Sequence, residues 1–106
     1  MDSYFFVKSG YKIQKIIVKE IIYVESMGDY IRFFLDDKKV VVLLALSKIL
    51  KLLPKENFVQ IHRSYIINLE KINFIQNNII SIGQYQLPIS KSRNKELLEI
   101  INLKLL

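Results

Sequence analysis

Residues 21–35 read IIYVESMGDYIRFFL and contain two strand patterns separated by a break. The first pattern, Ile21–Val24, is rich in the β-branched and aromatic residues that favour strands. Residues 27–29 interrupt it with a glycine and an aspartate. The second pattern, residues 30–35, alternates, so that Arg32 lies on one face and three apolar side chains lie on the other. This stretch therefore predicts two consecutive strands of a β-sheet.

Further strand patterns lie on both sides of this stretch. Gly10 can take the positive φ of a hairpin turn, and the pair Asn77 and Asn78 favours another turn. The expected strands cover residues 4–8, 13–18, 40–44, 58–61, 65–67, 72–76 and 79–82.

Two segments have helical spacing instead. The first follows the i, i+3, i+4, i+7 pattern of a short amphipathic helix that Pro54 ends, with Leu46, Ile49, Leu50 and Leu53 on its apolar face. A second helix is expected from about Ser92 to Leu103, built on Leu97, Leu98, Ile101 and Leu105. This order of elements indicates a mainly antiparallel β domain rather than an alternating α/β one. We expect a single domain over residues 1–106.

The composition is that of a globular protein, with 106 residues, of which 51% are hydrophobic and 25% charged. The absence of cysteine excludes a disulfide framework, a thiolate zinc site and a cysteine nucleophile. The longest apolar run, Val40–Leu46, is far shorter than the ~20 residues of a membrane-spanning helix. The N-terminus lacks the pattern of a signal peptide. We therefore expect a soluble, cytoplasmic protein that does not bind membranes.

The net charge of +6 is unevenly distributed along the chain. Residues 1–37 carry five basic and six acidic side chains, whereas residues 38–106 carry eleven basic and four acidic ones. A basic excess in one part of a domain favours a polyanionic partner. A lysine-rich solvated surface is the alternative explanation.

The residues that catalysis and metal binding require are sparse. His62 is the only histidine, and no Cys/His or Glu-x-x-His spacing is present. The three glycines are scattered, so no phosphate-cradling loop is expected. The sequence therefore predicts no enzyme, no metal site and no cofactor.

Three stretches resemble one family of bacterial regulators in their order and spacing. The first is residues 21–31, described above. Residues 57–68 read NFVQIHRSYIIN, close to that family's F-x-x-x-H-x-S-[FY]-[IV]-[IV]-N signature. Residues 87–95 read LPISKSRNK and match its P-[IV]-S-[RK] stretch ahead of a final helix. Over residues 4–102 the chain resembles the LytTR family of DNA-binding domains.

The resemblance implies an elongated assembly of small antiparallel sheets. Such a fold has about ten strands, one short internal helix and a C-terminal helix. It also implies the output domain of a bacterial response regulator in a two-component system, which inserts loops into successive major grooves of duplex DNA. Binding as a homodimer on direct repeats is implied too, as is a receiver domain if this chain is a fragment.

The resemblance also assigns residues to the DNA. Base contacts fall on Asp29, Tyr30, Arg63 and Lys91, and contacts to the DNA backbone fall on Lys48, Ser64, Ser92 and Lys95. Two of these depart from the family pattern. Lys91 replaces the usual arginine and so loses a bidentate fork for guanine. Asp29 places a carboxylate where phosphate would repel it, unless it accepts from a cytosine amino group or turns away.

Each assignment has a structural alternative. His62 is interpreted as a packed or hydrogen-bonded histidine, Ser64 as a contact or a turn residue, and Lys48 as a contact or part of a solvated helix face. The alternative function is a protein-interaction module that kept the fold but lost DNA binding. A single-stranded nucleic-acid binder needs exposed aromatics among cations, whereas most Phe and Tyr here lie in strand patterns that look buried.

Overall fold

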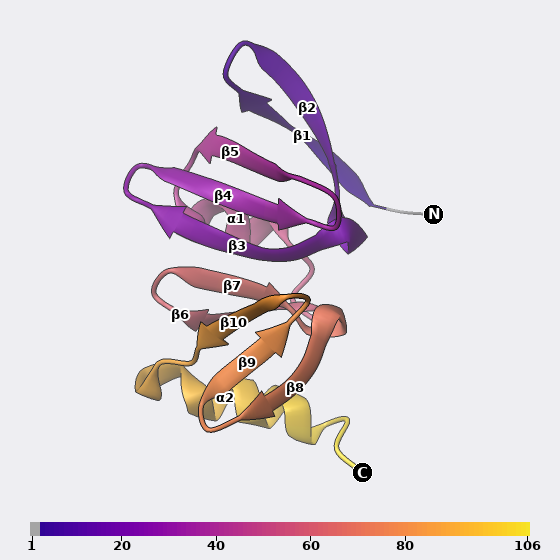
Figure 1. The fold of residues 1–106 in the computed structure, drawn as a ribbon, viewed down its shortest axis with the longest axis vertical. Helices are drawn as coiled ribbons and strands as arrows, with labels where there is room; N and C mark the ends of the chain where they lie inside the picture. The colour runs from indigo at the N-terminus through magenta and orange to yellow at the C-terminus, as the bar shows by residue number, and fades with distance from the viewer. Residues whose placement is uncertain (1–2) are drawn as a thin grey trace.

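The computed structural model describes residues 3–106 as ten strands and two α-helices, arranged in three small antiparallel sheets (Figure 1). The molecule is elongated, with principal extents of 44 × 33 × 25 Å. A two-stranded sheet, a five-stranded sheet and a three-stranded sheet follow one another along the long axis. The predicted fold class is confirmed.

The five-stranded sheet lies at the centre and has the order β5-β4-β3-β7-β6. Its strands are β3 (Ile21–Met27), β4 (Tyr30–Leu35), β5 (Lys39–Leu43), β6 (Phe58–His62) and β7 (Tyr65–Asn68). Successive side chains of a strand point to opposite faces, and here both faces of the central strands are covered. Such strands have continuous apolar sequences rather than alternating ones.

The first core fills one face of the central sheet. The hairpin of β1 (Tyr4–Ser9) and β2 (Lys12–Ile17) packs there together with α1 (Leu46–Leu52). The buried members of this first core include Ile16, Ile21, Val24, Ile31, Phe33, Ile49 and Ile66.

The second core fills the opposite face beneath β3, β7 and β6. It is closed by the sheet of β8 (Ile72–Gln76), β9 (Ile79–Ile82) and β10 (Tyr85–Pro88), and by α2 (Lys91–Asn102). Its members include Tyr23, Phe34, Ile61, Ile67, Ile80, Ile82 and Leu97.

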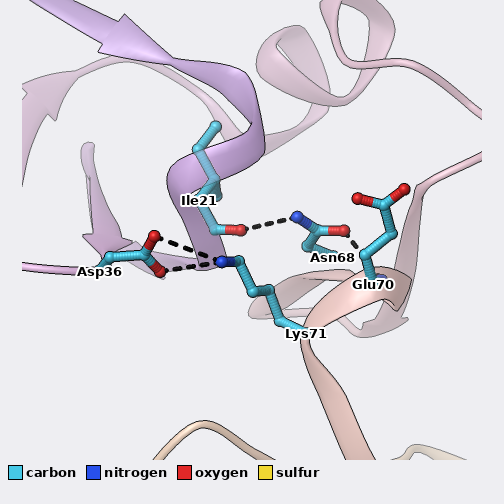
Figure 2. Close-up of polar contacts among 5 residues, drawn as sticks. All are labelled: Ile21, Asp36, Asn68, Glu70 and Lys71. Carbon is cyan, nitrogen blue, oxygen red and sulfur yellow. Dashed lines mark hydrogen bonds and ion pairs between the residues drawn. The ribbon is translucent and has the colours of Figure 1, made fainter. Parts of the chain in front are cut away.

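Two short 3₁₀ turns, Val18–Glu20 and Leu69–Lys71, carry the chain between the sheets. The second turn is held to the central sheet by polar contacts (Figure 2). The amide nitrogen of Asn68 donates to the Ile21 carbonyl at 2.9 Å, and its oxygen accepts from the Glu70 backbone at 3.0 Å. The ammonium group of Lys71 lies 3.0 Å from an Asp36 carboxylate oxygen.

Most of the expected elements are present within one or two residues of their predicted ends. Strand β3 runs three residues beyond its expected end at Val24, to Met27. Four further details differ. Strand β10 had no strand pattern of its own, and α2 begins one residue earlier than expected. Phe34 is buried because the second core covers the face opposite Phe33. The expectation that Leu98 is a core residue is wrong, since it is 42% exposed, and Leu105, which was expected to help build the helix, is 68% exposed. Leu98 lies on the exposed side of α2, and Leu105 lies beyond its end.

Candidate nucleic-acid interface

Four connections of the chain lie along one side of the molecule (Figure 1). They are the β3–β4 turn (27–30), the β5–α1 link (43–46), the β6–β7 turn (62–65) and the β10–α2 link (88–91). The antiparallel pairing brings the two hairpin turns together, because β3 and β6 both end, and β4 and β7 both begin, at the same side of the central sheet. We call this side the turn face.

Two backbone hydrogen bonds join the turns of this face to one another. The Ser26 N–H donates to the Ser64 carbonyl at 2.8 Å, which links the β3–β4 turn to the β6–β7 turn. The Ser90 N–H donates to the Ile61 carbonyl at 2.9 Å, which holds the start of α2 against the end of β6. The fold thereby brings three segments that are far apart in sequence to one surface.

Most of the predicted contact residues lie on this face. Asp29 and Tyr30 are exposed on the β3–β4 turn, Arg63 is exposed on the β6–β7 turn, and Ser64 beside it is half-buried. Lys91 begins α2 and is exposed. None of Arg63, Lys91, Lys48 and Lys95 forms an ion pair within residues 3–106. These cations are therefore available to an anionic partner.

The remaining predicted residues lie on the two helices. Lys95 is exposed one helical turn after Lys91, so the two lysines share a face of α2. Ser92 is exposed between them, and its hydroxyl lies 3.4 Å from that of Ser90. Lys48 is exposed in the first turn of α1, which starts at the turn face.

The β6–β7 turn is ordered by two side chains. The backbone N–H of Ser64 donates to Nδ1 of His62 at 3.1 Å, and the imidazole ring packs 5.2 Å from the ring of Tyr65. Nε2 of Gln60 donates to the carbonyls of His62 and Arg63 at 3.1 and 3.4 Å. His62 therefore has the hydrogen-bonded structural role that was expected. Gln60 was not singled out, because nothing in its spacing marks it as a partner of the turn.

This turn is tight although neither of its central residues has positive φ. Two-residue hairpin turns usually need positive φ to match the twist of their strands. The pairing of β6 with β7 shifts register between Gln60 and His62, and an irregularity of this kind changes the local twist beside the turn. Arg63 and Ser64 thus need no glycine or asparagine at their positions.

Asn77 and Asn78 were expected only to form a turn. Both have positive φ and exposed side chains, as in many tight turns. The Ile89 N–H donates to the Asn78 carbonyl at 2.9 Å, so this turn lies beside the start of α2. This exposed Asn-Asn pair is a further polar group beside the β10–α2 link, and its only sequence signal was the turn itself.

Of the two acidic residues at or next to the turn face, Glu25 has a cationic partner and Asp29 has none among the residues described. Glu25 lies 3.7 Å from Arg32 across β3 and β4. Burial, followed by the nearby Glu25 carboxylate, raises the pKa of Tyr23 above its usual range. Asp29 is the acid that remains exposed and unpaired on the turn face, among the residues described.

Residues 3–106 contain neither a cluster of metal-ligating side chains nor a membrane-spanning helix. No group of three or more His, Asp or Glu side chains there could hold a metal ion. No helix in this part of the chain has both the length and the hydropathy to cross a membrane.

Comparison with known proteins agrees with this geometry. A solved LytTr DNA-binding domain from Bacillus cereus superimposes with a TM-score of 0.82 at 20% identity, covering 93% of this chain and 96% of that one. The sensory transduction protein LytT of Bacillus subtilis (strain 168) is 29% identical over 100 residues, which are 89% of this chain. The chain spans 42% of that relative's length. The family model of the LytTr DNA-binding domain matches residues 11–102, and the chain therefore belongs to the LytTR family of DNA-binding domains.

Proposed function

We propose that this domain binds duplex DNA sequence-specifically, as the output domain of a bacterial transcription regulator acting in the cytoplasm. The observation that carries the proposal is the turn face, where unpaired cations and hydroxyls from three distant segments lie together. Cations attract the phosphate backbone and release its counterions, while hydroxyls fix the register of the protein on the duplex. No recognition helix is needed for this mode of binding.

The dimensions support contact with successive major grooves. The molecule is 44 Å long, and its turn face runs along that axis. One turn of B-DNA rises by about 34–36 Å. A domain lying along the duplex therefore reaches from one major groove to the next.

The proposed roles take the residues that the family resemblance assigns to the DNA and match each to a DNA group by its side-chain chemistry. Arg63 reads guanine through two parallel hydrogen bonds, and Lys91 reaches the same acceptors with one ammonium group. Asp29 accepts from a cytosine amino group, and Tyr30 forms a wall of the groove. Contacts to the DNA backbone come from Lys48, Ser64, Ser92 and Lys95.

The assembly is part of the proposal. Two copies of the domain bind direct repeats as a homodimer on DNA. The chain spans 42% of LytT, so a receiver domain in the full-length regulator is also proposed. Control by phosphorylation would then act outside residues 1–106.

The test is a fluorescence-anisotropy titration against random duplex and single-stranded DNA across a salt series, followed by in-vitro selection of duplex sites. We expect steeply salt-dependent duplex binding and an enriched direct repeat. Arg63→Ala and Lys91→Ala should each cost about 1–3 kcal/mol on the selected site and relax specificity at one position. Lys104→Ala, which removes a cation beyond the end of α2, is the matched control. Unchanged affinity in both contact variants would refute the base-contact assignments.

A protein-interaction module is the second candidate, and one observation favours it. The outer face of the β1–β2 hairpin exposes apolar side chains, with Tyr4, Phe6 and Ile13 exposed by 55%, 61% and 70%. Exposed apolar patches of this kind mark interaction sites. If the domain binds no duplex DNA at low salt, this face is the place to look for a protein partner. Binding of single strands alone would instead support stacking on these aromatic side chains, with Lys15 lying over the Tyr4 ring.

A further inference from the structure

The β1–β2 hairpin is a locally basic element within an N-terminal segment that sums to a slightly negative charge. From Ser3 to Ile17 the chain contains Lys8, Lys12 and Lys15 and no acidic residue. Of the acids in residues 3–37, Glu25 pairs with Arg32 and Asp36 pairs with Lys71, and neither pair involves the hairpin. The charge summed over residues 1–37 therefore does not show that the hairpin by itself is basic.

Residues 8–12, here called the hairpin tip, lie at one end of the turn face. The closed end of the hairpin points to the same side of the molecule as the β3–β4 and β6–β7 turns (Figure 1). The hydroxyl of Ser9 donates to the Val41 carbonyl at 2.8 Å, which holds the tip against β5. Lys8, Gly10 and Tyr30 line one groove of about 580 Å³ between β1 and the central sheet. The tip is thus adjacent to the Tyr30 end of the turn face.

The chemistry of the tip suits a phosphate backbone. Lys8 lies opposite Ile13 and Lys12 lies opposite Ser9 across the hairpin, so the two lysines flank the turn on opposite faces. Both are exposed and neither forms an ion pair within residues 3–106. Gly10 has a φ of +64° with open space where a Cβ would be, and Tyr11 beside it is fully exposed. The backbone at Gly10 is therefore open to close approach by a ligand.

We propose that the hairpin tip is an additional contact to the DNA backbone, in which Lys8 and Lys12 bind phosphates beyond the major groove that Tyr30 faces. The inference rests on the proposed function and extends its footprint. Because the tip lies at one end of the 44 Å axis, its phosphates lie at one flank of each half-site. Such contacts add affinity and salt dependence and carry no base specificity.

The first experiment compares the double variant Lys8→Gln/Lys12→Gln with Lys104→Gln on the selected duplex. Each lost phosphate contact lowers the slope of log K against log salt concentration by about 1, so the double variant should lose about 2. The site preference in selection should stay that of the parent protein. Lys104→Gln removes one exposed cation beyond the end of α2 and should retain the parental slope. An unchanged slope in the double variant would overturn the proposal.

The second experiment locates the contact on the DNA. Neutral methylphosphonates replace the phosphates at one flank of the half-site and then at the other. Parent protein should bind more weakly to one of these duplexes, and the double variant should not distinguish that duplex from the unmodified one. Equal additional losses in both proteins would place the tip away from those phosphates and refute the proposal. If parent protein fails to bind unmodified duplex at all, the proposed function itself fails, which is a different outcome.

Discussion

Asn68 shows how one buried polar side chain can connect two layers of the fold. It is 1% exposed, and both ends of its amide are hydrogen-bonded, to Ile21 in the central sheet and to Glu70 in the 3₁₀ turn. A buried donor or acceptor that loses its partner costs its full desolvation energy. The family signature places asparagine at this position, and the structure supplies the physical reason.

Asn68→Ala should lower the free energy of unfolding by about 2–3 kcal/mol, because the Ile21 carbonyl and the Glu70 N–H both lose their partner. Urea unfolding followed by circular dichroism measures the change. Asn73→Ala is the matched control, since its exposed amide donates to the Gly83 carbonyl at 3.0 Å and water can replace it. That variant should change stability by less than about 1 kcal/mol. Equal losses in the two variants would contradict this account of Asn68.

Tyr23 makes the stability depend on alkaline pH. Burial raises the pKa of its phenol in the folded state above the ordinary value of about 10. The unfolded chain therefore releases this proton first, and the free energy of unfolding should fall as the pH rises above about 10. Tyr23→Phe retains the ring that stacks 4.1 Å from Phe34 and should make this fall shallower, by at most about 1.4 kcal/mol per pH unit. Urea titrations at several pH values between 9 and 11 measure both slopes, and parallel slopes would count against this role.

In the β6–β7 turn, one pair of residues holds the backbone and another pair is proposed to contact DNA. Gln60 and His62 make the hydrogen bonds that hold the backbone, and Arg63 and Ser64 are the proposed contacts. Gln60→Met keeps the length of the side chain and removes its donor. Duplex affinity should fall roughly threefold to tenfold, the equivalent of one lost hydrogen bond. Amide exchange at Ser64 should become faster.

The control for this change is Gln86→Met on the exposed face of β10. It should leave both duplex affinity and the exchange of the β6–β7 turn as in the parent protein. Loss of global stability in Gln60→Met without any loss of affinity would show that the residue supports the fold rather than the reading of DNA.

The elements that could be predicted are those whose signals are local. Gly10, Asn77 and Asn78 were expected at turns, and each has positive φ. The sequence pattern did not predict strand β10, because Tyr85–Pro88 contains few strand-forming residues and ends in proline. It is a strand because Leu87 is buried in the second core and β9 offers a partner, which are tertiary effects.

At the scale of the whole molecule, the turn face depends on strand order. The β3–β4 and β6–β7 turns meet because β3 pairs with β7, more than thirty residues away in sequence. No spacing rule predicts that pairing. The local sequence patterns predicted each turn separately, and only the family resemblance implied that the turns share one face. The same limit hid the hairpin tip, since a sum of charges over the chain does not show which charges the fold places side by side.

The two cores share their central strands, so we expect them to unfold together. Adjacent residues of β7 point to opposite faces, Ile66 into the first core and Ile67 into the second. Ile66→Val and Ile67→Val should each cost about 0.5–1.5 kcal/mol, because each leaves a small cavity in a strand that both cores require. Urea unfolding followed by methyl NMR should show one midpoint, shifted equally at every probe in either variant. A midpoint that shifts only in the core carrying the substitution would show two independently stable halves; suitable probes are Ile16 and Ile49 in the first core and Ile61 and Ile80 in the second.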